Sequence, residues 1–137
     1  MSTRSLAVLV LALFALAAVI NTTTASAHER SSVKERYFQH RCGEQSVTAV
    51  KACIHRAVLH WSPTSSYSNA LYVANRETHF NPNICNSAGS GACGLYQFMP
   101  GTWRSTPYGG QDIFSAKQNA LAFAWGWTHL GPSHWGF

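Results

Sequence analysis

The chain has 137 residues, of which 46% are hydrophobic and 11% are charged, and its formal net charge is +5. This length favours one domain. A modest positive charge suits acidic partners as well as it suits solubility. There is no basic run and no stretch of interleaved aromatic and basic residues, so the sequence predicts no nucleic-acid partner.

Residues 1–27 have the pattern of a secretory signal peptide. Arg4 supplies a positive start, Leu6 to Ile20 form an unbroken apolar run, and Ala25-Ser26-Ala27 offers small residues for cleavage. The run is shorter than the roughly 20 residues that a membrane span needs. We therefore expect a secreted, extracellular protein with no stable membrane association once the signal is removed. An N-terminal anchor that stays uncleaved is the alternative.

The remainder is predicted to form a flexible N-terminal region at 28–45 and a helical domain at 46–137. Apolar residues recur at helical spacing over 46–60, 66–77 and 116–129, which predicts three main helices. No segment alternates as a strand would. The fold class expected is therefore mainly α, a compact helical domain with few or no strands.

The ends of these helices also carry sequence signals. Pro100 is well placed in the first turn of a further short helix. The run 115–118, Ser-Ala-Lys-Gln, is a capping box for the last main helix, and Gly131-Pro132 ends it. The first helix should turn these residues toward the core: Val47, Val50, Ile54, Ala57, Val58 and Trp61.

Four cysteines follow the signal segment: Cys42, Cys53, Cys85 and Cys93. An even number in an oxidising compartment predicts two disulfides, and three connectivities are open. We favour the local pairs, Cys42–Cys53 and Cys85–Cys93, because each would staple a segment that has little else to hold it. Zinc is the alternative, but no C-x-x-C or H-x-x-x-H pair occurs, so we expect neither a metal nor a cofactor.

Glu77 is the acidic residue that combines a predicted helix with an apolar stripe, because it follows Val73 and Ala74 by four and three residues. A carboxyl group taken out of water near the negative end of a helix resists ionising. Arg76 would oppose this effect, but we expect a neighbour on a helix to point elsewhere. An acid that stays protonated near neutral pH can protonate a glycosidic oxygen. The alternative is a solvated glutamate at a helix end.

Two separated motifs then carry a resemblance. The first is Arg-Glu-Thr-His-Phe-Asn-Pro-Asn at 76–83, and the second is Gly-Ala-Cys-Gly-Leu-Tyr-Gln-Phe-Met-Pro-Gly-Thr-Trp at 91–103. They resemble the lytic transglycosylase family, which has the lysozyme-like fold. That family carries a helix-ending Glu-Ser with Phe-x-Pro, followed by Gly-Ala-x-Gly-Leu-x-Gln-x-x-Pro-x-Thr. The compact secreted actinobacterial members and phage-type domains look most similar.

By this resemblance, Glu77 corresponds to the single catalytic acid and Gln97 to the glutamine that contacts the sugar. Gly94 and Leu95 correspond to the loop that shapes the cleft, and Asn119 matches a recurrent polar position in the last long helix. Thus the candidate substrate-binding residues include Gly94, Leu95, Gln97 and Asn119.

Aromatic residues add further candidates. Tyr96, Trp103, Trp125 and Trp135 have rings that suit stacking on sugar faces. Trp125 and Trp127 are expected in the core, whereas Trp135, near the C-terminus, is expected to be exposed.

The sequence also departs from the family pattern. Thr78 replaces the usual Ser after the acid, and the loop serine is ambiguous between Ser87 and Ser90. The later Tyr-rich motif is not obvious, and only 124–127 and 134–136 are candidates for it. Aromatic contacts at that end of the cleft therefore have no clear source in the sequence.

The number of acidic residues bears on the reaction. A glycosidase normally needs two carboxylates, roughly 5–10 Å apart, and only Asp112 is a realistic partner for Glu77. One carboxylate suffices if the sugar's own 6-hydroxyl attacks the anomeric carbon. We therefore expect a monomeric lytic transglycosylase that cuts the MurNAc-GlcNAc β-1,4 bond of peptidoglycan glycan strands and leaves 1,6-anhydro-muramyl ends. The alternatives are a lysozyme-type muramidase that uses Asp112 and a non-catalytic wall-binding module.

Overall fold

The computed structural model describes residues 29–30, 32, 36, 42–43, 46–61 and 67–137. The chain divides into two units, Met1–Tyr37 and Phe38–Phe137. The signal peptide predicted at 1–27 lies outside the described residues, as does most of the region 28–45, so both stay predictions. Helical backbone is present in the first unit at Glu29, Arg30, Ser32 and Arg36. Within the described ranges, no helix combines the length and the apolar character that crossing a bilayer requires.

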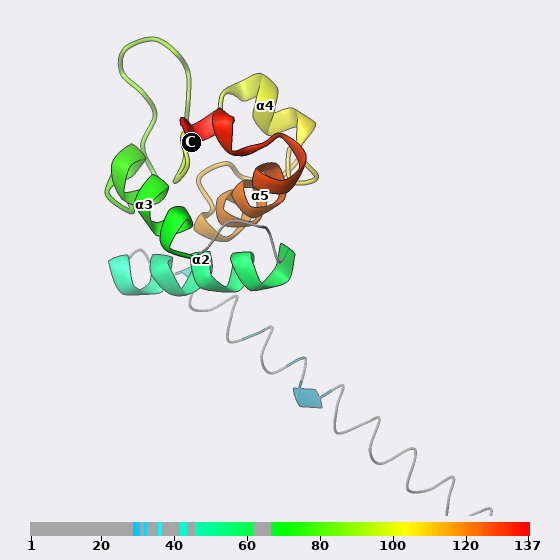
Figure 1. Ribbon diagram of the computed structural model, residues 1–137. Coiled ribbons are helices and arrows are strands. Elements are labelled where there is room, and N and C mark those ends of the chain that lie inside the picture. Colours follow the sequence, from blue (N-terminus) through cyan, green and yellow to red (C-terminus); the bar gives the residue numbers. More distant parts are fainter. Residues whose placement is uncertain (1–28, 31, 33–35, 37–41, 44–45, 62–66) are drawn as a thin grey trace, which may run out of the picture. The chain divides into compact units, whose positions relative to one another are not determined.

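The second unit is helical (Figure 1). Its elements are α2 (Val47–Trp61), α3 (Tyr67–Thr78), α4 (Pro100–Ser105), α5 (Ala116–His129) and the 3-10 helix η1 (Pro132–Trp135). Among the described residues, β-pairing is limited to two isolated antiparallel bridges, Cys85 with Cys93 and Cys93 with Phe98. The predicted mainly α class is confirmed, and the three long helices begin and end within one residue of their predicted bounds.

The helix α5 forms the centre of this unit. It packs against α2 and contacts η1, and α2 also packs against α3 (Figure 1). The consecutive residues 119–124 are all buried, so α5 is covered on most sides rather than along one stripe. The ring of Phe123 stacks on Tyr96, with centroids 3.9 Å apart, which joins α5 to the loop that precedes α4.

The helix α2 is amphipathic, and its packed face begins one turn later than predicted. Ser46 caps its start, because the Ala49 N–H donates to Ser46 Oγ at 3.2 Å. Val47 was expected in the core but is 48% exposed, so that prediction is wrong. Val47 is the first residue of the helix, and the buried face begins with Ala49 and Val50.

Local signals at the ends of α5 act largely as expected. Ser115 Oγ accepts a hydrogen bond from the Gln118 N–H at 3.4 Å. The return half of the capping box does not form, because the Ser115 N–H donates to Asp112 O instead. Gly131 has a φ of 87°, which glycine adopts without strain, and the chain leaves α5 there as predicted.

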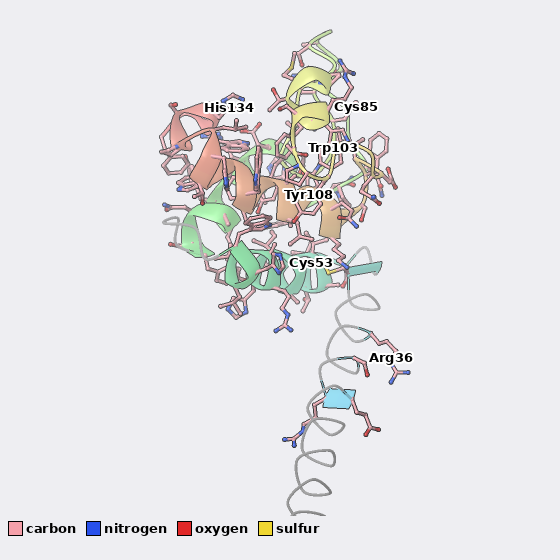
Figure 2. All side chains as sticks on the ribbon, turned by 90° about the vertical axis from the view of Figure 1, so that its right-hand side faces the viewer. Arg36, Cys53, Cys85, Trp103, Tyr108 and His134 are labelled. Atoms are coloured by element: carbon pink, nitrogen blue, oxygen red, sulfur yellow. A yellow bond between two sulfur atoms is a disulfide. The ribbon has the colours of Figure 1, made fainter. Side chains whose placement is uncertain are left out.

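Both favoured disulfides, Cys42–Cys53 and Cys85–Cys93, are present. Cys53 on α2 and Cys85 in the loop after α3 lie at opposite ends of the unit (Figure 2). The first disulfide therefore fastens the chain that enters α2. The second closes the loop that leads into the segment 94–97, called here the site loop.

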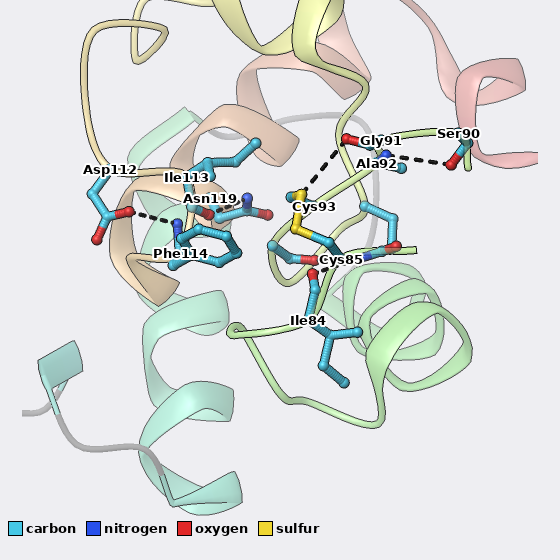
Figure 3. The surroundings of a disulfide bond; sticks show 12 residues. Ile84, Cys85, Ser90, Gly91, Ala92, Cys93, Asp112, Ile113, Phe114 and Asn119 are labelled. Atoms are coloured by element: carbon cyan, nitrogen blue, oxygen red, sulfur yellow. Dashed lines mark hydrogen bonds between the residues drawn. A yellow bond between two sulfur atoms is a disulfide. The ribbon is translucent and has the colours of Figure 1, made fainter. Parts of the chain in front are cut away.

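The buried side chain of Asn119 fastens the site loop to α5. Its Oδ1 accepts a hydrogen bond from the Tyr96 N–H at 2.9 Å. Its Nδ2 donates to Ile113 O at 2.8 Å, as Figure 3 shows. Gly94 lies so close that a Cβ atom there would overlap both Asn119 Nδ2 and Ile113 O. Its φ of 79° also favours glycine. Only glycine therefore allows the loop to approach the helix this closely.

Replacing Asn119 by Ala should destabilise the protein strongly. The change removes the partner of the buried Tyr96 N–H, which costs about 1–3 kcal/mol of the free energy of unfolding, and also that of the partly buried Ile113 carbonyl. Asn75→Ala, on the exposed side of α3, is the matched control and should change stability by less than about 0.5 kcal/mol. Urea unfolding of the two variants measures both values, and equal midpoints would contradict the role given to Asn119.

Candidate active site

Glu77 lies in a pocket of about 250 Å³, called here the Glu77 pocket. Its walls come from the end of α3, the site loop with the two residues after it, α4 and η1. The lining residues are Glu77, Tyr96, Gln97, Phe98, Met99, Thr102, His134 and Trp135. Apolar surface with a few polar groups is typical of a site for a small polar ligand.

The Glu77 side chain projects from the last turn of α3 and is 27% exposed. Arg76 donates to its Oε1 from Nη2 at 2.7 Å and from Nε at 3.1 Å. The prediction that Arg76 points away from Glu77 is therefore wrong. The reason is tertiary, since Arg76 Nη2 also donates to Trp135 O in η1 at 2.6 Å, which draws the guanidinium to this side. The hydrogen bond to Glu77 raises the pKa of Arg76, which thus stays positively charged.

The backbone leaves α3 sharply just beyond Glu77. His79 and Phe80 have φ values of 51° and 65°, a left-handed conformation that is strained for residues other than glycine. Thr78 is buried, and its Oγ1 lies within hydrogen-bond distance of two carbonyl oxygens, Leu95 O at 3.0 Å and Ala74 O at 3.1 Å. This hydroxyl joins the helix end to the site loop. A serine hydroxyl would provide the same bond, so the departure from the family's serine keeps this contact.

Gln97 also has left-handed backbone, with a φ of 50°. Its Nε2 donates to Ile84 O at 2.9 Å and to Gly94 O at 3.0 Å. Since backbone carbonyl oxygens accept both amide hydrogens, Oε1 is the group that Gln97 has for a ligand. The two candidate loop serines, Ser87 and Ser90, are exposed and do not line the Glu77 pocket.

Most of the other predicted substrate-binding residues are buried and support the pocket wall from the core. Leu95, Tyr96 and Asn119 are buried, with 0%, 1% and 0% exposure. The Tyr96 hydroxyl donates to Ala70 O at 3.1 Å, and burial raises the pKa of this phenol well above its ordinary value. The Tyr96 ring therefore stays neutral and belongs to the core, while the loop that contains it forms part of the pocket wall.

Asp112 and Trp103 lie at a different pocket, of about 440 Å³. Asp112 Oδ1 accepts a hydrogen bond from the Phe114 N–H at 2.9 Å, close to the Cys85–Cys93 disulfide (Figure 3). Trp103 is buried and its ring meets that of Phe98 at 5.6 Å. The structure therefore does not bring Asp112 into the pocket that holds Glu77. Within the described part of the chain, no cluster of three or more His, Cys, Asp or Glu residues could hold a metal.

The sequence analysis named 134–136 as a candidate aromatic motif but did not assign His134 to the site. His134 and Trp135 line the Glu77 pocket. Trp135 was expected to be exposed but is 6% exposed, so that prediction is wrong. The candidate motif at 134–136 was the available signal, and only packing identifies it. Trp127 is buried as expected, whereas Trp125 is half-buried and stacks on His129 at 4.6 Å.

A comparison with known families agrees with this geometry. The family model of the transglycosylase SLT domain matches residues 57–126, half of the chain. The match contains both motifs and most of the lining of the Glu77 pocket, while η1 lies outside it. No curated protein and no solved structure was found to match. The chain therefore belongs to the transglycosylase SLT domain family, and its function is peptidoglycan cleavage of the lytic transglycosylase type.

Proposed function

We propose that this protein is a secreted lytic transglycosylase that cuts the MurNAc-GlcNAc β-1,4 bond with Glu77 as its one catalytic carboxyl group. The observation that carries the proposal is the position of Glu77 beside Gln97 in a pocket that Asp112 does not line. A glycan strand offers ring faces to apolar side chains and hydroxyl or acetamido groups to polar ones. The Glu77 pocket has both kinds of wall.

One carboxyl group can complete the reaction. Glu77 donates its proton to the glycosidic oxygen as the bond to the anomeric carbon breaks, and the released GlcNAc carries that proton in its new hydroxyl. The 6-hydroxyl of MurNAc then bonds to the anomeric carbon and gives its proton to the Glu77 carboxylate. This restores the acid and consumes no water. The MurNAc acetamido group stabilises the charged intermediate between the two steps.

The position of Asp112 supports this route over hydrolysis. A hydrolase normally holds two carboxylates on either side of the scissile bond. Asp112 lines the second pocket, and its Oδ1 is engaged with the backbone of Phe114. A water-activating base would have to come from elsewhere, whereas the 6-hydroxyl route needs only Glu77.

Secretion rests on two features of the chain. The segment 1–27 has the three parts of a signal peptide. Two disulfides are typical of an oxidising compartment such as the exterior of the cell. Both features support the proposal that the enzyme is exported to where peptidoglycan is accessible.

Export should therefore release a shortened chain. Expression of the full sequence in a bacterial host is expected to yield protein in the medium that begins at His28, because cleavage follows Ala25-Ser26-Ala27. Intact mass spectrometry of the medium and of the membrane fraction measures this. A membrane-bound chain that keeps residues 1–27 would support the uncleaved anchor instead.

The products should distinguish lyase from hydrolase. Digestion of purified peptidoglycan is expected to give 1,6-anhydro-muramyl ends, since the 6-hydroxyl replaces water as the nucleophile. Mass spectrometry of the released fragments detects these ends. Fragments heavier by one water would contradict the lyase route and leave glycosidic cleavage intact.

Glu77→Gln should lower the rate of peptidoglycan lysis about a thousandfold, because an amide neither donates nor accepts the transferred proton. Binding of glycan strands should persist, because the side-chain shape is kept. Asp112→Asn is the matched control. Its amide oxygen can still accept from the Phe114 N–H, so its lysis rate should equal that of the parent.

The same pair of variants tests the alternatives. Equal lysis by Glu77→Gln and the parent would remove Glu77 from the mechanism. Loss of lysis in Asp112→Asn would favour a muramidase that uses both carboxyl groups. Absence of lysis by the folded parent, with glycan binding retained, would indicate a wall-binding module.

A further inference from the structure

One wall of the Glu77 pocket lies outside the residues that the family model matches. This wall is η1, called here the C-terminal wall, and it contributes His134 and Trp135 to the lining. The family match therefore accounts for Glu77 and Gln97 but not for this side of the pocket.

Trp135 anchors the C-terminal wall to the core. Its ring is buried and lies 4.7 Å from the ring of Phe123 and 5.7 Å from that of Phe98. Its Nε1 donates to Tyr96 O at 3.3 Å. Gly126 on α5 leaves room for the indole, because a Cβ atom there would lie 2.9 Å from it. The wall is thus seated on the site loop and on α5.

The two residues that flank Glu77 each donate to a backbone carbonyl of a different wall. Thr78 Oγ1 lies 3.0 Å from Leu95 O in the site loop. Arg76 Nη2 lies 2.6 Å from Trp135 O in the C-terminal wall. With the indole bond to the site loop, these contacts close a ring of hydrogen bonds through α3, the site loop and the C-terminal wall. Arg76 is the member of this ring that also holds the carboxyl group.

We infer that Arg76 is a positioning residue that keeps Glu77 and the C-terminal wall in register, and that this wall is part of the sugar-binding surface. The inference rests on the function proposed above. Both Arg76 contacts to Glu77 fall on Oε1, which leaves Oε2 as the oxygen that exchanges the proton with the substrate. His134 is the polar side chain by which the wall contacts the sugar.

The ion pair between Arg76 and Glu77 suits the second step of the proposed reaction. In the second step Glu77 is a carboxylate that receives the proton of the 6-hydroxyl. A guanidinium that holds Oε1 orients the carboxylate without occupying Oε2. Lysine would keep the charge but is one bond shorter and lacks the second nitrogen that arginine uses here, so it cannot reproduce both contacts.

Three variants test this role in kinetics on purified, peptide-free glycan strands. Arg76→Gln is expected to lower kcat about a hundredfold and to raise KM, because the carboxyl group loses its ion-pair partner and the wall loses its hydrogen bond to α3. Arg76→Lys should lose about tenfold in kcat, since charge remains but the geometry is incomplete. Arg56→Gln, an exposed arginine on α2, is the control and should keep the parent's kcat and KM. Melting temperatures are measured so that every assay runs well below unfolding.

A lower melting temperature in Arg76→Gln with unchanged kcat and KM would mean that Arg76 only supports the fold, and it would overturn the inference. If Arg76→Gln does not fold, Arg76→Lys provides the test. Parent-like kcat and KM values in Arg76→Lys would then overturn the inference. Glu77→Gln separates the two proposals. Full activity of Glu77→Gln defeats the proposed function, whereas its inactivity beside parent-like Arg76 variants defeats the inference alone.

Discussion

The amide of Asn119 is the interaction on which the candidate site depends. From the first turn of α5 it bonds to two backbone groups, accepting from the Tyr96 N–H and donating to Ile113 O. Water does not compete there, because Asn119 is buried. An amide suits this position since it has a donor and an acceptor on one flat group. The contact fixes the distance between the site loop and α5. Because Gln97 ends the site loop, the same contact fixes the position of Gln97 in the Glu77 pocket.

The end of α3 is held to the rest of the site by the neighbours of Glu77 rather than by Glu77 itself. Thr78 contacts the site loop, and Arg76 contacts the C-terminal wall. Successive residues on a helix point about 100° apart, so one helix end can reach two walls at once. The carboxyl group lies between these two attachments. Its position relative to Gln97 and to η1 is thus determined by backbone carbonyl groups that are distant in sequence.

Several sequence expectations about side-chain placement failed, among them those for Val47, Trp135 and Arg76. Val47 satisfies the helical spacing of α2, but it begins the helix and is exposed. Trp135 lies near the C-terminus in a polar setting, yet the site loop and α5 cover its ring. Arg76 was expected to follow helix geometry alone, and the carbonyl of Trp135 draws its long side chain toward Glu77 instead.

The sequence by itself determined the helices, their ends and the family, and it favoured the two disulfides that the structure then showed. Apolar spacing, a capping serine and Gly131-Pro132 act between residues that are a few positions apart, so their effect does not depend on the rest of the fold. The tertiary structure alone decided which residues share a pocket. It placed Asp112 at a different pocket from Glu77 and brought His134 beside Glu77. The physical reason is that burial and hydrogen-bond partners of these side chains come from segments far away along the chain, which no local pattern encodes.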